Sequence, residues 1–223
     1  EYVRVEERAV IILPDSLSYE DAASLPCAAV SAWSALHVEA PLAPGQTVLV
    51  QGTGGVALFG LQIARMFGAR VIALTSSESK AETLRAMGAA AVINYRETPD
   101  WEHPVLALTG GKGVDKVVEI GGAGTINHSL ACTRAGGEIG LVGYVTGTEG
   151  GVSPIAIQIR SVKIAPISIG PRLSFEALLA AMDATGMRPV IDSVFPFAKF
   201  GEALLHLESG AHVGKVVINF DQK

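Results

Sequence analysis

Hydrophobic positions in the middle of the chain follow two alternating patterns. Short, nearly continuous apolar runs predict strands over 48–51, 70–75, 90–95, 114–120, 138–144 and 161–169. Between them, apolar residues recur every three or four positions, which predicts helices over 55–68, 77–88 and 124–137 and a shorter helix or turn over 101–111. Apolar runs of this kind are typical of strands buried on both faces of a parallel sheet. The pattern therefore predicts an α/β fold with a doubly wound parallel sheet.

The two ends of the chain lack this alternation. Val3 and Val5 alternate with polar neighbours, which predicts a half-buried strand within residues 1–13. Helices are expected over 18–25, with Ser18 as N-cap, and over 27–38. Beyond Gly170 the pattern predicts a helix, an extended segment, a second helix and a final strand, over 174–186, 190–197, 198–210 and 214–220. Terminal strands without a sheet of their own predict that the chain begins partway through a larger protein.

Composition narrows the class of protein. Hydrophobic residues make up 49% of the chain and charged residues 17%, so a large buried core is expected. The formal net charge is −5 and no run of Lys or Arg occurs, which argues against nucleic-acid or membrane partners. No apolar stretch is long enough to span a bilayer, and no signal-peptide pattern is present. Cys27 and Cys132 cannot form a disulfide framework, and the reducing cytosol suits them, so we expect a cytoplasmic protein.

A glycine-rich loop connects the first predicted core strand to its helix. The sequence from Gly52 to Ala57, GTGGVA, fits G-x-G-x-x-G/A. Small residues here allow a tight turn and a close approach of the backbone to a pyrophosphate, beside the partial positive charge of a helix N-terminus. Dinucleotide binding is the interpretation we favour. A purely structural turn and a Rossmann-like methyltransferase are the alternatives.

The second strand carries the information on which dinucleotide binds. NAD sites place an acidic residue at the tip of this strand, where it binds the ribose hydroxyls. Here the tip carries Ser76 and Ser77, which leave room for a 2′-phosphate, and Lys80 follows one turn later. This arrangement favours NADP, although either serine could instead cap the next helix. Glu78 would favour NAD if its side chain turned toward the ribose.

Together with its flanks, the chain resembles the medium-chain dehydrogenase/reductase superfamily, in particular its quinone oxidoreductase-like and zinc-type alcohol dehydrogenase-like branch. The segments that carry the resemblance are LPDSLSYEDAASLPCAAVSAWSAL, PGQTVLVQGTGGVALFGLQIA, LRAMGAAAVINYRETPDW, VVEIGGAGTINHSL, AGGEIGLVGY and FGEALLHLESGAHVGKVVINF. The resemblance implies an NADP-binding Rossmann domain over 41–190. It also implies that 1–40 and 191–223 are remnants of a GroES-like β domain, most of which the chain lacks.

The resemblance also implies roles for individual residues. Those expected to bind the cofactor are Ser31 near the nicotinamide, Gly52, Thr53, Gly54, Gly55 and Val56 at the pyrophosphate, Ser76, Ser77 and Lys80 at the 2′-phosphate, Tyr95 near the adenosine phosphate, Gly121 and Gly122 beside the ribose, Val142, Gly143 and Tyr144 at the nicotinamide, and Lys215 at the phosphates. Tyr95 could equally pack at a strand end, and Lys215 could be an exposed lysine on an edge strand. No catalytic side chain is identified.

The implied activity is hydride transfer between a nicotinamide cofactor and a small-molecule substrate, which is a carbonyl or alcohol, a quinone or an activated alkene. The alternative is a nucleotide-binding module without turnover. Cys27 matches the position of a catalytic zinc ligand in zinc-dependent members, but a catalytic zinc needs three protein ligands, and zinc is not expected from this chain. The apolar strand within 161–170 would form an exposed sheet edge, which predicts a homodimer through that edge.

Overall fold

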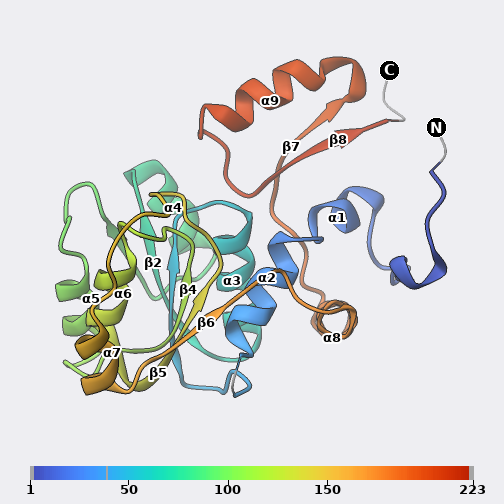
Figure 1. The fold of residues 1–223 in the computed structure, drawn as a ribbon. Helices are drawn as coiled ribbons and strands as arrows, with labels where there is room; N and C mark the ends of the chain where they lie inside the picture. Colours follow the sequence, from blue (N-terminus) through green and yellow to red (C-terminus); the bar gives the residue numbers. More distant parts are fainter. Residues whose placement is uncertain (1–2, 39, 221–223) are drawn as a thin grey trace.

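The computed structural model describes residues 3–38 and 40–220 and is built around a parallel six-stranded sheet (Figure 1). The strand order is β3-β2-β1-β4-β5-β6. The strands are β1 (Thr47–Gln51), β2 (Arg70–Thr75), β3 (Ala91–Asn94), β4 (Val114–Glu119), β5 (Thr133–Leu141) and β6 (Lys163–Pro166). The order reverses direction between β1 and β4, as in dinucleotide-binding Rossmann folds, where ligands bind at this switch point. The predicted doubly wound parallel sheet is confirmed.

Helices cover both faces of the sheet (Figure 1). One face carries α2 (Ala28–Leu36), α3 (Gly55–Met66), α4 (Glu78–Ala86) and α8 (Arg172–Thr185), and the other carries α5 (Glu102–Leu108), α6 (Ile126–Cys132) and α7 (Pro154–Arg160). Two apolar clusters fill the two layers. Val48 and Val50 of β1 belong to the first cluster and Leu49 to the second, because alternate side chains of a strand point to opposite faces.

A smaller unit lies beside the carboxyl edge of the large sheet (Figure 1). Its strands β7 (Ile191–Pro196) and β8 (Lys215–Asn219) form a separate parallel pair, connected by the 3-10 turn Phe197–Lys199 and α9 (Phe200–Glu208). The helix α1 (Tyr19–Ser24) packs against both strands. The amide of Gly214 donates to the carbonyl of Thr53 at 2.9 Å, which joins the smaller unit to the loop after β1.

Local sequence signals fix several element boundaries as predicted. Ser18 is the N-cap of α1 and forms a capping box with Asp21, each side chain accepting from the other residue's backbone amide. The helix α3 ends before Gly68, whose φ of +73° suits glycine.

The structure differs from the predicted elements at three places. The described part of 1–13 contains no strand. Val3 and Val5 are 84% and 55% exposed, and a 3-10 turn occupies Glu7–Ala9. Residues 1 and 2 lie outside the described residues. The helix expected over 124–137 ends at Cys132, since Thr133 already pairs with Val114 of β4. The helix α7 had no counterpart in the prediction.

Candidate dinucleotide-binding site

The glycine loop forms a tight turn from β1 into α3. Gly52 has φ of +83°, a region that side chains rarely adopt, and its amide donates to the carbonyl of Leu74 at 2.8 Å. Gly54 is the N-cap of the twelve-residue α3, and no side chain caps it. The first amides of a helix have no partner within it, and they carry a partial positive charge. The loop thus presents donors at the switch point between β1 and β4.

Lys215 lies over this loop although it is distant in sequence. Gly54 and Gly214 form an isolated parallel bridge, so the first residue of β8 is held beside the start of α3. A Cβ atom placed on Gly55 would lie 2.8 Å from Cδ of Lys215. Glycine at this position therefore leaves space for the lysine stem. The structure brings together the glycine loop and Lys215, two parts that the resemblance had linked.

The tip of β2 places further groups near the loop. Ser77 is the N-cap of α4, but its hydroxyl makes no capping bond and lies 3.3 Å from the hydroxyl of Ser79. Ser77 thus occupies the N-cap position of the capping alternative, but it does not form the side-chain hydrogen bond of a cap. Glu78 pairs with Arg85, and this hydrogen bond raises the pKa of the arginine. Its carboxylate is directed along α4 and toward Arg85.

Lys80 connects α4 to the segment before β8. Its Nζ donates to the carbonyls of Gly210 and His212, at 2.5 Å and 3.3 Å. Burial lowers the pKa of His212, and the nearby charges of Lys80 and Lys215 lower it further, against the opposing effect of Asp192. Lys80 and Lys215 thus place two positive charges around His212, whose lowered pKa favours its neutral form.

A buried carboxylate organises the tip of β4. Glu119 has no exposed surface; its Oε1 accepts from the amides of Gly121 and Gly122, at 2.9 Å and 3.0 Å, and from the Thr125 hydroxyl. Its Oε2 accepts from Gln51 Nε2 at 2.6 Å and from the Ser129 hydroxyl. Gln51 Oε1 in turn accepts from the amides of Ile120 and Gly121, both at 3.1 Å. This network fixes the backbone of Gly121 and Gly122, which sequence reasoning had placed beside a ribose.

The tip of β5 folds onto the tip of β4. The amides of Val142 and Gly143 both donate to the carbonyl of Glu119, at 2.8 Å and 3.2 Å. A Cβ atom on Gly122 would lie 2.6 Å from Cα of Tyr144, so these two turns touch. The Tyr144 ring is 66% exposed, whereas Ser31 is buried within α2. Of the residues predicted at the nicotinamide, Tyr144 thus lies on an exposed turn, whereas Ser31 is buried on a helix.

A cavity of about 390 Å³ opens at the carboxyl ends of β1, β2, β3 and β4. It is lined by Gln51, Gly52, Leu74, Tyr95, Pro99, Trp101, Ile120, Gly121, Gly124, Thr125, His128, Val145 and Thr146. Gly52, Tyr95 and Gly121 were predicted site residues. Trp101 and His128 were not, although an aromatic residue shortly after a strand tip is a signal that could have indicated a ring-binding wall.

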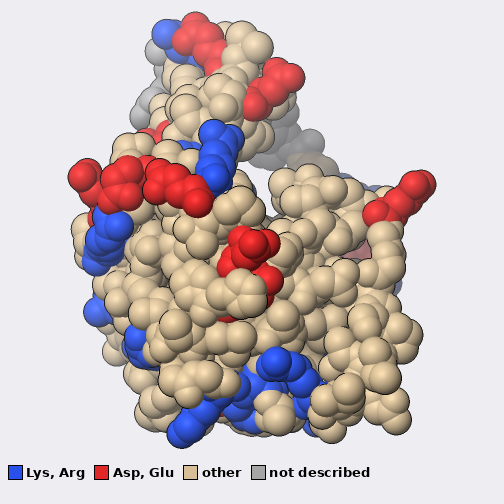
Figure 2. Space-filling model, turned by 90° about the vertical axis from the view of Figure 1, so that its left-hand side faces the viewer, with Lys and Arg blue, Asp and Glu red and all other residues tan. Residues whose placement is uncertain are grey.

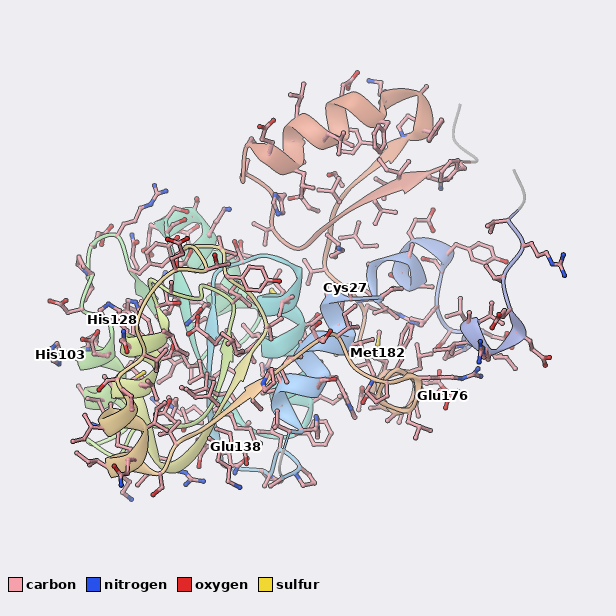
Figure 3. The ribbon with its side chains drawn as sticks, viewed as in Figure 1. Cys27, His103, His128, Glu138, Glu176 and Met182 are labelled. Carbon is pink, nitrogen blue, oxygen red and sulfur yellow. The ribbon has the colours of Figure 1, made fainter. Side chains whose placement is uncertain are left out.

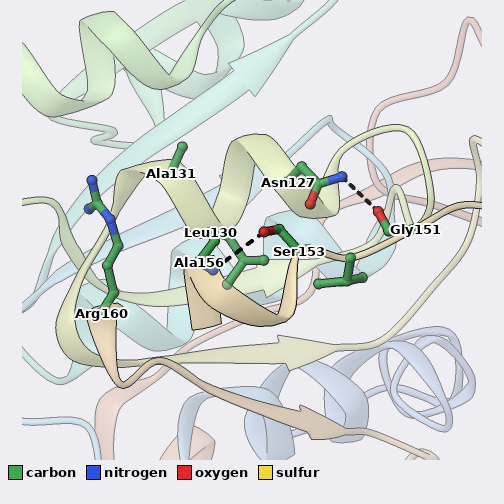
Figure 4. Close-up of a pocket in the computed structure, with 8 residues that line it drawn as sticks. Asn127, Leu130, Ala131, Gly151, Ser153, Ala156 and Arg160 are labelled. Atoms are coloured by element: carbon green, nitrogen blue, oxygen red, sulfur yellow. Dashed lines mark hydrogen bonds between the residues drawn. The ribbon is translucent and has the colours of Figure 1, made fainter. Parts of the chain in front are cut away.

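A second, shallower hollow of about 590 Å³ lies between α6 and α7 (Figure 4). Asn127 donates to the carbonyl of Gly151 at 2.9 Å, and Ser153 accepts from the amide of Ala156. Arg160 donates to the carbonyl of Thr133 at 3.1 Å. Because these polar groups already have protein partners, the hollow offers little for a ligand to bind. Figure 2 views the molecule from the side that carries α5 to α7. The acidic side chains visible there lie mainly over the upper half, among several basic ones, and further basic side chains gather along the lower edge.

Cys27 is the residue that the resemblance links to a catalytic zinc. Cys27 is exposed at the start of α2 and lies far from His103 and His128 (Figure 3). Within residues 3–38 and 40–220, no three His, Cys, Asp or Glu side chains are grouped so that they could hold a metal ion. Burial raises the pKa of the Cys132 thiol to about 12, so it is not a ready thiolate ligand.

Among the described residues, no helix is both long and apolar enough to cross a bilayer.

Comparison with known proteins identifies the family. The family model for zinc-binding dehydrogenases matches residues 55–184, more than half of the chain. The chain belongs to the zinc-binding dehydrogenase family. A zinc-type alcohol dehydrogenase-like protein of Schizosaccharomyces pombe is 41% identical over 226 residues, which cover 99% of this chain and 65% of that protein. A quinone oxidoreductase of Pongo abelii is 28% identical, covering 98% of this chain and 68% of that protein.

Solved structures support the same assignment. A putative alcohol dehydrogenase of Sinorhizobium meliloti superposes with a TM-score of 0.88 at 42% identity, over 94% of this chain and 61% of that one. A mycobacterial structure complexed with NADPH gives a TM-score of 0.82 at 31% identity, over 92% of this chain and 66% of that one. The chain thus spans about two thirds of the length of the dehydrogenase-family relatives that it matches.

Proposed function

We propose that this chain binds NADP(H) and forms the cofactor-binding part of an oxidoreductase. The hydride would pass between the nicotinamide and a carbonyl or alcohol, a quinone or an activated alkene. The observation that carries the proposal is the glycine loop at the switch point of the sheet, with the space left by Gly55 occupied by Lys215. The residues present fit a dinucleotide, because backbone donors, a lysine and an adjoining cavity converge at this edge.

The preference for NADP over NAD rests on the β2 tip. No acidic side chain precedes α4 there, and Glu78 is paired with Arg85. The hydroxyl of Ser77 is not used as a helix cap. Lys80 lies one turn into α4. Within the described residues its ammonium group donates only to backbone carbonyls, and a phosphate can replace these as partners.

The cofactor supplies the hydride chemistry when it is bound. The chain's own residues hold it: the loop amides and Lys215 bind the diphosphate, and the network around Glu119 keeps the β4 tip rigid. We assign no catalytic acid or base to this chain. The alternative proposal is a nucleotide-binding module without turnover. That alternative would be favoured if the chain binds NADPH but does not oxidise it in the presence of quinones, aldehydes and activated alkenes.

Calorimetric titration of the purified chain with NADPH and NADH tests the proposal. We expect the wild-type chain to bind NADPH more tightly than NADH. Lys80→Ala should weaken NADPH binding about tenfold or more, since a hydrogen bond to a charged group is worth about 1.5–3 kcal/mol. The same substitution should leave NADH binding unchanged. Lys112→Ala, an exposed lysine before β4, is the matched control. Equal binding of both dinucleotides would overturn the NADP preference, and binding of neither would overturn the function.

A further inference from the structure

The cavity beside the glycine loop has one wall made of rings. Trp101 is 3% exposed, and its ring centroid lies 5.3 Å from that of His128 on α6. Pro99 and Tyr95 also line the cavity, and Leu74 and Ile120 add apolar surface. A flat aromatic ligand would gain stacking and apolar contact in such a cavity.

A neighbouring carboxylate fixes the state of the His128 ring. Nδ1 of His128 lies 2.6 Å from Oε2 of Glu102, whose side chain is only 14% exposed. An ionised carboxylate can only accept a hydrogen bond, so the proton must be on Nδ1. In the neutral ring, Nε2 is then left as a hydrogen-bond acceptor. The His128 side chain is 33% exposed and lines the cavity, which leaves this acceptor available to a ligand.

Three other polar side chains of the cavity, those of Gln51, Thr125 and Thr146, are already paired. Gln51 and Thr125 bind Glu119, and the Thr146 hydroxyl donates to the carbonyl of Gly121 at 2.8 Å while accepting from the amide of Gly124 at 2.8 Å. Within the described residues, Nε2 of His128 has no such partner. A ligand that enters the cavity therefore meets an apolar pocket with a hydrogen-bond acceptor of fixed tautomer on its wall.

We propose that His128, positioned by Glu102, accepts a hydrogen bond from the 6-amino group of adenine and so selects adenine dinucleotides over hypoxanthine ones. This inference rests on the proposed dinucleotide function and adds a residue that reads the base. Hypoxanthine carries a carbonyl oxygen where adenine carries the amino group, so two acceptors would face each other across the same contact. A site built around a donor of the ligand rejects the analogue that lacks it.

The test compares NADPH and NADH with their hypoxanthine analogues by calorimetric titration. The wild-type chain should bind each adenine dinucleotide about tenfold more tightly than its analogue, which corresponds to a hydrogen bond of about 1.4 kcal/mol. His128→Phe keeps a ring beside Trp101 and should abolish this discrimination. The matched control is His103→Phe, since His103 lies 3.9 Å from Glu102 with a side chain that is 75% exposed, and it should leave the discrimination intact.

The role of Glu102 has its own readout. The ¹⁵N shifts of the His128 ring should show Nδ1 protonated in the wild-type chain, and Glu102→Gln should produce a mixture of tautomers together with weaker discrimination. The comparison of adenine and hypoxanthine dinucleotides on the wild-type chain needs no variant, so it tests the proposal even if His128→Phe misfolds. Equal binding of adenine and hypoxanthine dinucleotides overturns this inference but leaves the dinucleotide function standing. Absence of binding by all four overturns both.

Discussion

At the scale of single residues, His37 shows how burial sets chemistry. Its ring stacks on Trp33 with centroids 4.3 Å apart and meets the edge of Phe67 at 5.1 Å. Nδ1 lies 2.8 Å from the carbonyl of Trp33, and Nε2 is buried without a partner in the described residues. Burial lowers the pKa of His37 from its ordinary value of 6.5, and the charge of Lys116 lowers it further, against the raising effect of the Trp33 carbonyl.

This shift predicts a loss of stability on mild acidification. Because the native ring resists protonation while the unfolded one accepts a proton near 6.5, the free energy of unfolding should fall as the pH drops from about 7 through 6.5 toward the lower native pKa. His37→Phe keeps the stacking on Trp33 and should flatten this dependence in urea unfolding series at several pH values. His212, whose pKa is also lowered, would account for any remaining slope, and His212→Asn measures it. An unchanged slope in His37→Phe would contradict the prediction.

Lys116 is the second residue whose environment decides its role. It is 2% exposed in the middle of β4, where a lysine is rare without a partner. Its Nζ donates to Glu138 on the neighbouring strand β5 and to the carbonyl of Ala40 at 2.9 Å. The pair joins two adjacent inner strands of the sheet and does not line the cavity beside the glycine loop, so we assign it a structural role.

At the scale of elements, the contact between β8 and the glycine loop depends on Gly214. Its φ is +92°, and a Cβ atom there would lie 2.3 Å from the carbonyl oxygen of Val190. Gly210, four residues earlier, has φ of +64° with open space around its Cα. The two glycines therefore separate the cost of backbone conformation from the cost of a steric clash.

Alanine substitutions at these two positions should differ in their effect. Gly210→Ala should cost about 1 kcal/mol, because only the left-handed conformation is penalised. Gly214→Ala should cost more than about 2 kcal/mol and also weaken dinucleotide binding, because Lys215 is displaced from the loop. Urea unfolding and calorimetric titration measure both effects. Equal costs at the two positions would show that the close approach to Val190 is not needed.

At the scale of the whole molecule, β6 is the outer strand of the sheet and pairs only with β5 among the described strands. The segment after it carries Ile169, which is 44% exposed with φ of +63°. A parallel-sheet edge with apolar neighbours tends to pair with another chain. We propose a homodimer that continues the sheet across the segment 161–170.

Sedimentation velocity tests this dimer. Ile169→Lys places a charge at the proposed interface and should give monomers with unchanged thermal stability, since the side chain is outside both apolar clusters. Leu205→Lys, at a residue that is 68% exposed on the remote helix α9, should leave the dimer intact. A dimer that persists in the first variant, or dissociates only in the second, would place the interface elsewhere.

The sequence alone determined the features that depend on neighbouring residues. Strand and helix periods, the capping box of Ser18 and Asp21, and the glycine loop before α3 are all local, because they involve residues within one or two turns of each other. The parallel sheet followed from the same periods, since β-α-β units leave few ways to connect the strands. The local pattern failed at Val3 and Val5. Alternation of apolar and polar residues predicts which side chains of a strand would share a face, but an extended segment forms a strand only when a partner strand is there to pair with it.

Tertiary structure decided the features that join distant segments. The helix expected through Thr133 gave way to β5 because β4 offered a hydrogen-bonding partner there. Lys215 reaches Gly55 from 160 positions away along the chain only because β8 docks on the glycine loop. The wall of Trp101 and His128 arises because parallel strands bring their carboxyl ends, and the loops that follow, to one edge of the sheet. Periodicity carries no signal for such contacts, since they depend on the order of the strands in space.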